Sequence, residues 1–375
     1  MPAHPARKQL QKELAVYVKP ETIKGMILFV VDISMYILAI VLVLASSSWI
    51  LKLIGGIIAG IKMANLSTLA HDAAHNSLTG SRTLNKYLAI IGFTPGLFNY
   101  ALWLHDHHFL HHRKTNEEHP DSYVPLSKQE YDALTAFGKF KYRMYRAPTI
   151  WIFGLYYIIE RWWKVKFFPR AHMPRQVQRQ AWFQFSYLML YISAYLILLV
   201  IAPLYSSTST LEAVIYGFVI PFYVYQTLYS FTVFVQHNHY RIPWFKEARP
   251  REGDGQQAYI TVQLVFPKWL STAVHNVYDH TAHHVHPAIP SYHLPAAQDK
   301  LNKMIGGRAV ISKFSLGWLY SLMRRCKLYD HENHYWTDFD GNPTTRVTLA
   351  SAEDNPELYQ GKTERRQRLG ELAVS

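Results

Sequence analysis

The clearest pattern along the chain is a set of four long apolar runs that fall into two pairs. Each run reaches the about 20 residues that a helix needs to cross the hydrocarbon core of a bilayer, which is ~30 Å thick. Within each pair, a short connector rich in Ser and Thr separates the runs. The pattern predicts an all-α integral membrane protein with four transmembrane helices in two hairpins, about 25–45, 49–70, 181–203 and 211–235.

The distribution of Lys and Arg predicts which side of the membrane the long segments face. Residues 71–180 contain fifteen of them, whereas the connectors 46–48 and 204–210 contain none. Because basic residues near the ends of spans favour the cytoplasmic side, we expect residues 71–180, both termini and the C-terminal third to lie in the cytoplasm. The predicted division is a cytoplasmic N-terminal segment 1–24, a membrane-embedded domain 25–318 and a cytoplasmic tail 319–375.

Two further apolar stretches are less suited to crossing the bilayer. Residues 84–104 contain Pro95 between two glycines, which interrupt a helix. Residues 148–163 are rich in Trp and Tyr and are flanked by basic residues, as interfacial helices are. We expect both stretches to lie in or dip into the cytoplasmic leaflet.

Composition narrows the chemistry that the chain can perform. Charged residues make up 17% of the 375 residues, against about 25% in an ordinary soluble domain. The single cysteine, Cys326, excludes a disulfide framework, a Cys-ligated zinc site, an iron–sulfur cluster and a rubredoxin module within the chain. The formal net charge of +13 indicates contact with anionic lipid headgroups rather than nucleic acid, because the basic residues cluster beside the apolar runs.

Histidine clusters are the strongest sign of function, and there are three of them: His71 with His75, His108 with His111 and His112, and His280 with His283 and His284. On a helix, residues three and four apart share a face, so each cluster can direct its rings at one place. Eight imidazoles are about twice what one zinc ion needs, since a structural zinc site has four protein ligands. Imidazole also suits iron and copper. The clusters predict a centre of two metal ions with positions left open for oxygen.

Other polar residues near the clusters leave alternatives open. The second cluster also contains His105 and His107, and His107 paired with His111 is an alternative. We favour His108 with His111 and His112 for their three-plus-one spacing, which leaves His105 and His107 beside the site or on the surface. Two acidic neighbours of the clusters, Asp72 and Asp279, could accept the second ring N–H of a metal-bound imidazole. Three histidines flank the third cluster and are less favoured as ligands, although His275 could still assist the site: His275, His286 and His293. The remaining ones are expected to be ordinary polar residues: His119, His172, His331 and His334.

The three clusters resemble the histidine boxes of the membrane fatty acid desaturase superfamily. The third continues as His284-Val-His-Pro-Ala-Ile-Pro-Ser-Tyr-His-Leu294, which is similar to the acyl-lipid desaturases of the omega-6 type. Gln236-His237-Asn238-His239, after the fourth run, resembles their Gln-His segment between the second and third boxes, and Asn276 matches an asparagine common there.

This resemblance implies an oxygen-dependent, di-iron enzyme whose cytoplasmic helical cap holds two iron ions over four membrane helices. It implies nine metal ligands: His71, His75, His108, His111, His112, His237, His280, His283 and His284. An enzyme of this kind uses O₂ and two external electrons to remove hydrogens from neighbouring methylene groups of a fatty acyl chain. The chain would be linked to a lipid, to CoA or to a carrier protein.

The electrons are expected to come from a separate protein. The sequence contains neither a dinucleotide-binding glycine motif after a strand nor the His-Pro-Gly-Gly of a fused cytochrome b5 domain. We expect an external carrier of the ferredoxin, rubredoxin or cytochrome b5 type. Basic residues of the middle segment would dock an acidic carrier or, equally well, contact anionic lipid: Arg113, Lys114, Lys139, Lys141, Arg143 and Arg146.

Two rival functions remain open from the sequence. A related membrane di-iron enzyme would hydroxylate or ketolate a carotenoid or an alkane, or would form an alkyne or a terminal alkene, with the same clusters. A metal transporter without enzymatic activity is disfavoured, because transport needs polar ligands inside the spans, whereas these histidines lie at or beyond the span ends.

Two features inside the first pair of runs predict how the helices pack. Asp32 and Lys62 each lie roughly 10–12 Å along their helices from the cytoplasmic end at 1.5 Å per residue. Since an unpaired charge at that depth costs about 2.5–3.5 kcal/mol, we expect the two side chains to pair. Gly56 and Gly60 form a G-x-x-x-G motif, which predicts a close approach of a neighbouring helix within the first hairpin.

The fourth run carries many aromatic residues and Pro221, which is able to kink it. Because this run leads directly to His237, one interpretation is that its aromatic side chains guide an extended acyl chain from the cytoplasmic leaflet. Thr227 and Ser230 would then be small positions along that path. The other interpretation is ordinary packing between helices.

Overall fold

The structure is a computed structural model that describes residues 7–117, 122–171, 173–246, 258–306 and 309–346. The chain divides into two compact units. Residues 18–109 and 153–231 form the first, here named the span unit. Residues 1–17, 110–152 and 232–375 form the second, here named the terminal unit, and only its described residues are considered. The segment boundaries predicted after residues 24 and 318 remain predictions.

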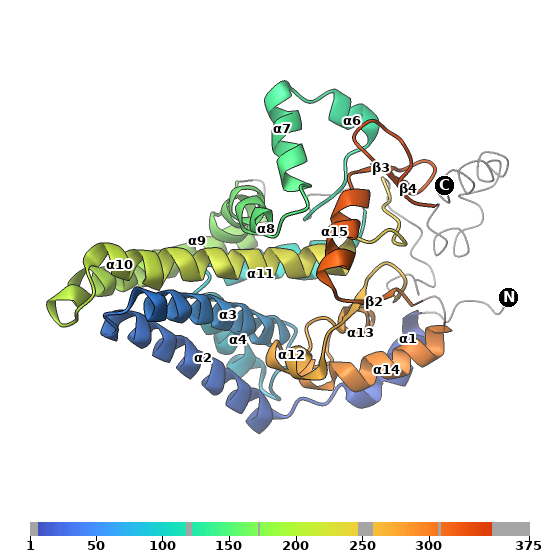
Figure 1. Cartoon of the computed structure of the whole chain (residues 1–375). Coiled ribbons are helices and arrows are strands. Elements are labelled where there is room, and N and C mark those ends of the chain that lie inside the picture. The colour runs from blue at the N-terminus through green and yellow to red at the C-terminus, as the bar shows by residue number, and fades with distance from the viewer. Residues whose placement is uncertain (1–6, 118–121, 172, 247–257, 307–308, 347–375) are drawn as a thin grey trace. The chain divides into compact units, whose positions relative to one another are not determined.

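Four long apolar helices are present, as the sequence predicts, and Figure 1 shows the first two in blue. Each is long and apolar enough to cross a membrane: Thr22–Ala45, Trp49–Ala74, Arg175–Leu204 and Thr210–His237. The first two are the helices α2 and α3. The third comprises α9 (Arg175–Ile201) and the short η4 (Ala202–Leu204). The fourth comprises α10 (Thr210–Val214), the π-helix η5 (Ile215–Val219) and α11 (Ile220–His237), whose last residues belong to the terminal unit.

The two weaker apolar stretches form shorter helices. The first becomes α4 (Arg82–Phe93) and α5 (Tyr100–Leu104), which are separated where the sequence predicts an interruption. The second becomes α8 (Trp151–Tyr156), which continues directly into the π-helix η3 (Tyr157–Phe167).

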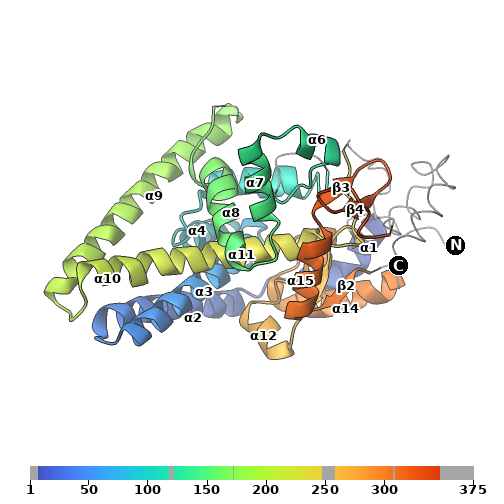
Figure 2. The same cartoon turned by 45° about the horizontal axis from the view of Figure 1, so that its top comes forward.

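Helices α2 and α3 run side by side in both views (Figure 1, Figure 2). The Nζ atom of Lys62 lies 2.8 Å from a carboxylate oxygen of Asp32, so the predicted pair inside the apolar helices is confirmed. Gly55 permits the close contact between the two helices, because a Cβ atom there would lie 2.9 Å from the carbonyl oxygen of Ala39.

The prediction that Gly56 and Gly60 bring a neighbouring helix close is right, but the expected neighbour is wrong. A Cβ atom on Gly56 would lie 2.6 Å from the carbonyl oxygen of Tyr216, and one on Gly60 would lie 2.6 Å from Cβ of Val224. Both contacts are with the fourth long helix rather than with α2. The two glycines lie four residues apart on one face of α3, whereas Gly55, one position earlier, faces α2.

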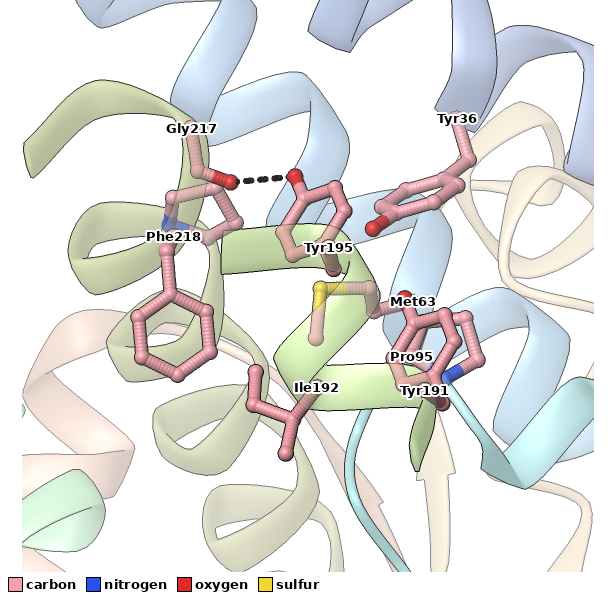
Figure 3. A pocket seen from close by; sticks show the side chains of 9 residues that line it. Tyr36, Met63, Pro95, Tyr191, Ile192, Tyr195, Gly217 and Phe218 are labelled. Carbon is pink, nitrogen blue, oxygen red and sulfur yellow. Dashed lines mark hydrogen bonds between the residues drawn. The ribbon is translucent and has the colours of Figure 1, made fainter. Parts of the chain in front are cut away.

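The π-helix η5 changes the hydrogen bonding of the fourth long helix. The hydroxyl group of Tyr195, on α9, donates a 2.7 Å hydrogen bond to the carbonyl oxygen of Gly217, which Figure 3 shows as a dashed line. This bond borders a cavity of about 10 Å³, enough for a water molecule at most. It is therefore too small for an acyl chain. Its lining residues are Tyr36, Met63, Pro95, Tyr191, Ile192, Tyr195, Gly217, Phe218 and Pro221.

Most aromatic residues of the fourth long helix pack against other side chains of the span unit. The hydroxyl groups of Ser67 and Tyr225 lie 2.9 Å apart, and the ring of Phe222 lies 5.1 Å from that of Trp162. Thr227 bonds to the carbonyl oxygen of Tyr223. These contacts favour the packing interpretation of the aromatic pattern, and the substrate path remains a prediction.

The terminal unit combines short helices with four strands. Its helices, apart from the ends of those already given, are α1 (Arg7–Leu14), η1 (Ala15–Tyr17), α6 (Lys128–Asp132), α7 (Ala136–Tyr145), α12 (Lys268–Ala273), α13 (His280–Val285), η7 (Ser291–His293), α14 (Leu294–Ile305) and α15 (Leu316–Arg325). Its strands are β1 (Gln263–Val265), β2 (Ile311–Lys313), β3 (Leu328–Asp330) and β4 (Tyr335–Thr337). The all-α prediction therefore needs correction to a predominantly helical fold. Strands of three residues are too short to produce an alternating pattern in the sequence.

Two small sheets stabilise the terminal unit. Strands β1 and β2 pair in parallel, with Gln263 opposite Ile311, and β3 and β4 pair antiparallel. The unit also contains a buried apolar cluster of Ile242, Ile260, Val262 and Val310. The part of the predicted tail that the structure describes, residues 319–346, is folded onto this unit, and the basic sequence 364–368 lies outside the described residues.

Candidate metal centre

Four histidines of the terminal unit converge on one place: His111, His237, His280 and His284. One ring nitrogen from each lies within 4.8 Å of those of the other three, and all four residues are buried. Nε2 of His237 lies 3.0 Å from Nε2 of His280. The rings therefore face one another rather than the solvent.

Local structure explains how these rings come together. His237 is the last residue of α11, and His111 is the last residue of the π-helix η2 (His105–His111). His280 and His284 lie four residues apart on α13, so they share one face of that helix. Sequence spacing predicted the last relation correctly, since α13 is a regular helix.

The surroundings of His284 favour its neutral imidazole. Burial lowers the pKa of His284 well below its usual value, and the neighbouring His280, His112, His237 and His111 lower it further. A neutral imidazole has a ring nitrogen free of a proton, which is the form that binds a metal ion. Four converging imidazole rings suit iron, copper or zinc, so the residues present fit the predicted iron site.

A second pair in the terminal unit adds to the candidate ligands. Nε2 of His112 lies 3.2 Å from Nε2 of His283. The ring of His112 also lies 4.5 Å from that of His284. The terminal unit thus brings together six of the nine predicted ligands.

The span unit contains a separate group of three histidines. One ring nitrogen from each of His71, His75 and His107 lies within 4.8 Å of the other two. Nε2 of His71 is 3.1 Å from Nε2 of His107. The ring of His108 lies 4.7 Å from that of His75. His107 is therefore a candidate ligand that the three-plus-one spacing left out, and the nine-residue ligand set remains a prediction.

The π-helix accounts for the omission of His107. The spacing argument assumed an α-helix, in which residues three and four apart share a face. In a π-helix the hydrogen bonds run from residue i to i+5, so the turn is wider and different residues share a face. Because η2 carries every histidine of the second cluster except His112, which follows its last residue, the ligand pattern could not be read from α-helical spacing.

Charged and aromatic side chains of the span unit hold η2 in place. The buried carboxylate of Asp106, directly before His107, lies 3.3 Å from the guanidinium group of Arg161 and also contacts Lys166. Trp103 stacks on His107 with ring centroids 4.4 Å apart and donates a 2.9 Å hydrogen bond to the hydroxyl group of Tyr229. These contacts fix the ring of His107 and the residues that directly precede it.

The two acidic residues next to predicted ligands behave differently. Oδ1 of Asp72 lies 3.4 Å from Nδ1 of His71, a long contact that agrees with the predicted role. Asp279 instead accepts a 2.8 Å hydrogen bond from Gln263. Burial raises the pKa of Asp279 to about 6, although the bond from Gln263 opposes the rise.

His239 has a structural role. The backbone N–H of Arg241 donates to its Nδ1, so its Nε2 carries the proton and faces the hydroxyl group of Ser312 at 3.1 Å. Burial lowers the pKa of His239 to about 3, and Arg241 lowers it further. Both ring nitrogens are thus engaged by protein atoms.

Other histidines fit their expected roles. His331 lies 3.4 Å from the carbonyl oxygen of Pro125, and His334 lies 3.4 Å from the hydroxyl group of Tyr329. His119 and His172 lie outside the described residues.

One member of the predicted basic docking surface needs correction. Arg146 is 3% exposed, and its guanidinium group donates hydrogen bonds to the carbonyl oxygens of Tyr123 and Cys326 at 2.7 and 3.2 Å. It therefore stabilises the interior of the terminal unit and is not available to a partner. Arg113, Lys114 and Arg143 are exposed, as expected.

Long apolar helices together with buried clusters of imidazoles that could hold a metal ion are typical of one class, the membrane proteins that bind metal through histidines. Comparison with known proteins gives the family. The model of the family described as fatty acid desaturase matches residues 47–314. The chain belongs to the fatty acid desaturase family, and it is an oxidoreductase that acts on fatty acyl chains.

Individual relatives agree with the family. The chain is 26% identical over 295 residues to the sn-1 oleoyl-lipid 12-desaturase of Picosynechococcus sp., covering 78% of this chain and 81% of the relative. It is 25% identical over 307 residues to the chloroplastic omega-6 fatty acid desaturase of Spinacia oleracea, covering 81% of this chain and 65% of the relative. The sn-1 oleoyl-lipid 12-desaturase of Synechocystis sp. is 25% identical over 282 residues, covering 74% of this chain and 76% of the relative.

Proposed function

We propose that the protein introduces a second double bond into a monounsaturated acyl chain of a membrane lipid. The names of the relatives in Picosynechococcus and Synechocystis, sn-1 oleoyl-lipid 12-desaturase, support a lipid-linked oleoyl chain as substrate. The name of the spinach relative, omega-6 fatty acid desaturase, supports the same type of product. The observation that carries the proposal is the buried cluster of His111, His237, His280 and His284 in a chain of this family.

The proposed cofactor is a pair of iron ions held by His71, His75, His108, His111, His112, His237, His280, His283 and His284, with His107 as a further candidate. Bound iron would supply the activation of O₂ that the removal of hydrogen from an unactivated methylene group requires. Each ligand is an imidazole, so the site would bind iron without adding negative charge from the protein.

The role of the protein itself is to position these rings and to exclude water from them. His284 is fully buried and His283 is 2% exposed, which limits the access of bulk water to the cluster. Asp106 and Trp103 fix the backbone and the ring of His107. Preorganised groups of this kind lower the cost of bringing the reacting atoms together.

The proposed topology has four helices across the bilayer, with both termini and the histidines on the cytoplasmic side. The four long apolar helices support the crossing, and the fifteen basic residues within 71–180 support the orientation. We propose an external electron carrier of the ferredoxin, rubredoxin or cytochrome b5 type. The exposed Arg113 and Lys114 would attract such an acidic carrier.

The test is expression in a host whose lipids contain oleate and lack dienoic acids, followed by gas chromatography and mass spectrometry of the lipids. A dienoic acyl chain is the expected product, and it should disappear in His284→Ala although the variant still reaches the membrane. Iron analysis of the purified protein should give two ions per chain. A hydroxylated acyl chain in place of the diene would contradict the proposal and support the related hydroxylases.

A further inference from the structure

The first turn of α13 is capped in an unusual way. Asp279 stands at the position before the helix, where an Asp side chain commonly accepts hydrogen bonds from the first turn. Here the Asp279 side chain makes no such bond. The backbone N–H of Ala282 donates instead to Oε1 of Gln298, on α14, at 2.8 Å.

Gln298 is the end of a chain of hydrogen bonds that leads back to Asp279. Nε2 of Gln298 donates to Oδ1 of Asn302 at 2.9 Å, and Nδ2 of Asn302 donates to Oε1 of Gln263 at 2.8 Å. Nε2 of Gln263, on β1, donates to Oδ1 of Asp279 at 2.8 Å. Gln263, Asn302 and Gln298 are here named the amide relay.

Every bond of the amide relay points in the same direction. The backbone N–H of Ala282 is the first donor, and the carboxylate of Asp279 is the last acceptor. Each amide must present its oxygen to one neighbour and its nitrogen to the next, so the orientation of each is fixed by the others. Aligned hydrogen bonds strengthen one another in a buried setting, and Gln298 is only 1% exposed.

Both ends of the relay are attached to the turn that carries the third histidine cluster. Helix α13 has six residues, which is too short to keep its orientation by its own hydrogen bonds. A small rotation of α13 about its axis would move the ring nitrogens of His280, His283 and His284 together. The hydrogen bonds of the amide relay attach α13 to β1 and α14 and thereby oppose this rotation.

We propose that Gln263, Asn302 and Gln298 are positioning residues that set the metal affinity of the third histidine cluster. The inference rests on the proposed function, because it presumes that His280, His283 and His284 bind metal. Groups that orient a metal-binding histidine commonly change affinity 10–100-fold when they are removed. The relay would act on three such histidines at once through the helix that carries them.

The experiment is a titration of the full-length protein with Co²⁺ after removal of metal by a chelator, in nanodiscs. Visible absorption of Co²⁺ measures affinity and nitrogen coordination, and circular dichroism of the metal-free protein measures the melting temperature. Gln298→Met and Asn302→Leu keep the size of the side chain and remove its hydrogen bonds. We expect each to weaken Co²⁺ binding by about 10–100-fold.

A matched control perturbs the other end of the same helix. Nε2 of Gln11, on α1, donates a 2.9 Å hydrogen bond to the carbonyl oxygen of Val285, the last residue of α13. Gln11→Met removes an amide of the same kind outside the relay. We expect it to lower the melting temperature about as much as Gln298→Met, with Co²⁺ affinity unchanged.

A variant that reverses the direction of the hydrogen bonds in the amide relay distinguishes an effect of amide orientation from an effect of packing. Gln298→Glu can accept from Ala282 but cannot donate to Asn302, so the amides of Asn302 and Gln263 would have to turn around. Gln263 would then present its oxygen to the carboxylate of Asp279. We expect this single variant to bind Co²⁺ weakly. Combination with Asp279→Asn supplies a donor at the other end, and we expect it to recover most of the lost affinity.

The inference is overturned if Gln298→Met, Asn302→Leu and Gln298→Glu all bind Co²⁺ as tightly as the parent. It is also overturned if Gln11→Met weakens binding as much as they do, or if Asp279→Asn brings no recovery. If the histidines do not bind metal as the proposed function requires, the experiment gives a different result. In that case the parent and His284→Ala would bind Co²⁺ equally weakly, and the relay variants would not be distinguishable from either.

Discussion

The ammonium group of Lys62, on α3, lies 2.8 Å from the carboxylate of Asp32, on α2. The Asp32 side chain is 3% exposed and that of Lys62 is 15% exposed. Removal of either partner leaves the other charge unpaired, at a cost of about 2.5–3.5 kcal/mol on membrane-insertion scales. We expect Asp32→Leu and Lys62→Leu each to lower the melting temperature clearly, and the double variant to lose less than their sum. Thermal unfolding in detergent gives the coupling energy.

An exposed pair provides the control for this cycle. Lys24 and Glu21 lie 3.7 Å apart with both side chains 46% exposed. Solvent screens such a pair, so its coupling should be close to zero. Equal coupling in the two cycles would show that burial between α2 and α3 does not strengthen the pair.

The close contact at Gly60 predicts that a single added methyl group strongly destabilises the protein. A Cβ atom there would lie 2.6 Å from Cβ of Val224 and 2.7 Å from the carbonyl oxygen of Pro221, so α3 and the fourth long helix would have to separate. We expect Gly60→Ala to reduce the yield of monodisperse protein and to lower its melting temperature. Gly317→Ala is the control, because the nearest atom would be 4.0 Å away. If the two variants behave alike, the close contact at Gly60 is not important for stability.

The ring of His107 lies against His71 and His75 in the span unit. We expect His107→Ala to reduce the iron bound per chain, as measured by elemental analysis. His105→Ala, two positions earlier, should leave iron content unchanged. Full iron content in His107→Ala together with a loss in His108→Ala would instead support the ligand set that spacing favours.

His239 is two positions from a predicted ligand and should respond differently to substitution. Its ring nitrogens bond to the backbone N–H of Arg241 and to Ser312. We expect His239→Asn to destabilise the protein by about 1–3 kcal/mol, the cost of a lost buried hydrogen bond, while iron content stays that of the parent. His237→Ala should lose iron. Loss of iron in both variants, with folding intact, would make His239 part of the metal site.

The lowered pKa of Glu130 predicts that its contribution to the stability of the folded protein is lost in acid. Burial alone would raise its pKa, but hydrogen bonds from Lys246 and Ser127 outweigh burial and lower the pKa to about 2. A lowered pKa stabilises the folded state above the ordinary value of 4.5, and this contribution disappears as the pH falls towards 2. Glu130→Gln removes it. The parent should therefore be slightly more stable at neutral pH, by ~0.2–1 kcal/mol because the site is partly exposed.

The measurement is the difference in melting temperature between the parent and Glu130→Gln from pH 7 to pH 2. We expect a constant difference down to about pH 4.5 and a decreasing one below it. Lys128→Gln, which removes an exposed pair with Asp132 on the same helix, is the control. A difference that grows as the pH falls would contradict the assignment.

The long helices could be predicted from the sequence because a membrane span needs only length and apolar composition. The pair of Asp32 and Lys62 could be predicted for a related reason, since the cost of an unpaired charge at matched depths leaves few alternatives. The neighbour of Gly60 could not, because a motif of small residues specifies a close contact but not which helix makes it.

The histidine clusters also contain relations that could be predicted from the sequence and relations that could not. His280 and His284 lie on a regular helix, so their spacing gave their relation directly. His107 was only the less favoured alternative, because no pattern in the sequence indicates a π-helix. Arg146 was placed on the surface because its charge suggested it, whereas its guanidinium group is buried by carbonyl groups that only the folded chain brings together.

The order in which the ribosome makes the chain has a consequence for the four-histidine cluster. His111 is made early, but its partners on α11 and α13 follow much later, and Gln298 and Asn302 later still. At about 5–20 residues per second, the nascent chain carries an incomplete set of ligands for roughly ten seconds or more. Metal acquired during this interval would have too few ligands to be held firmly. If iron binds as proposed, it should enter only after synthesis of α14, because that helix carries Gln298 and Asn302, which we propose to orient α13. A chain truncated before α14 should then reach the membrane without a stable metal centre.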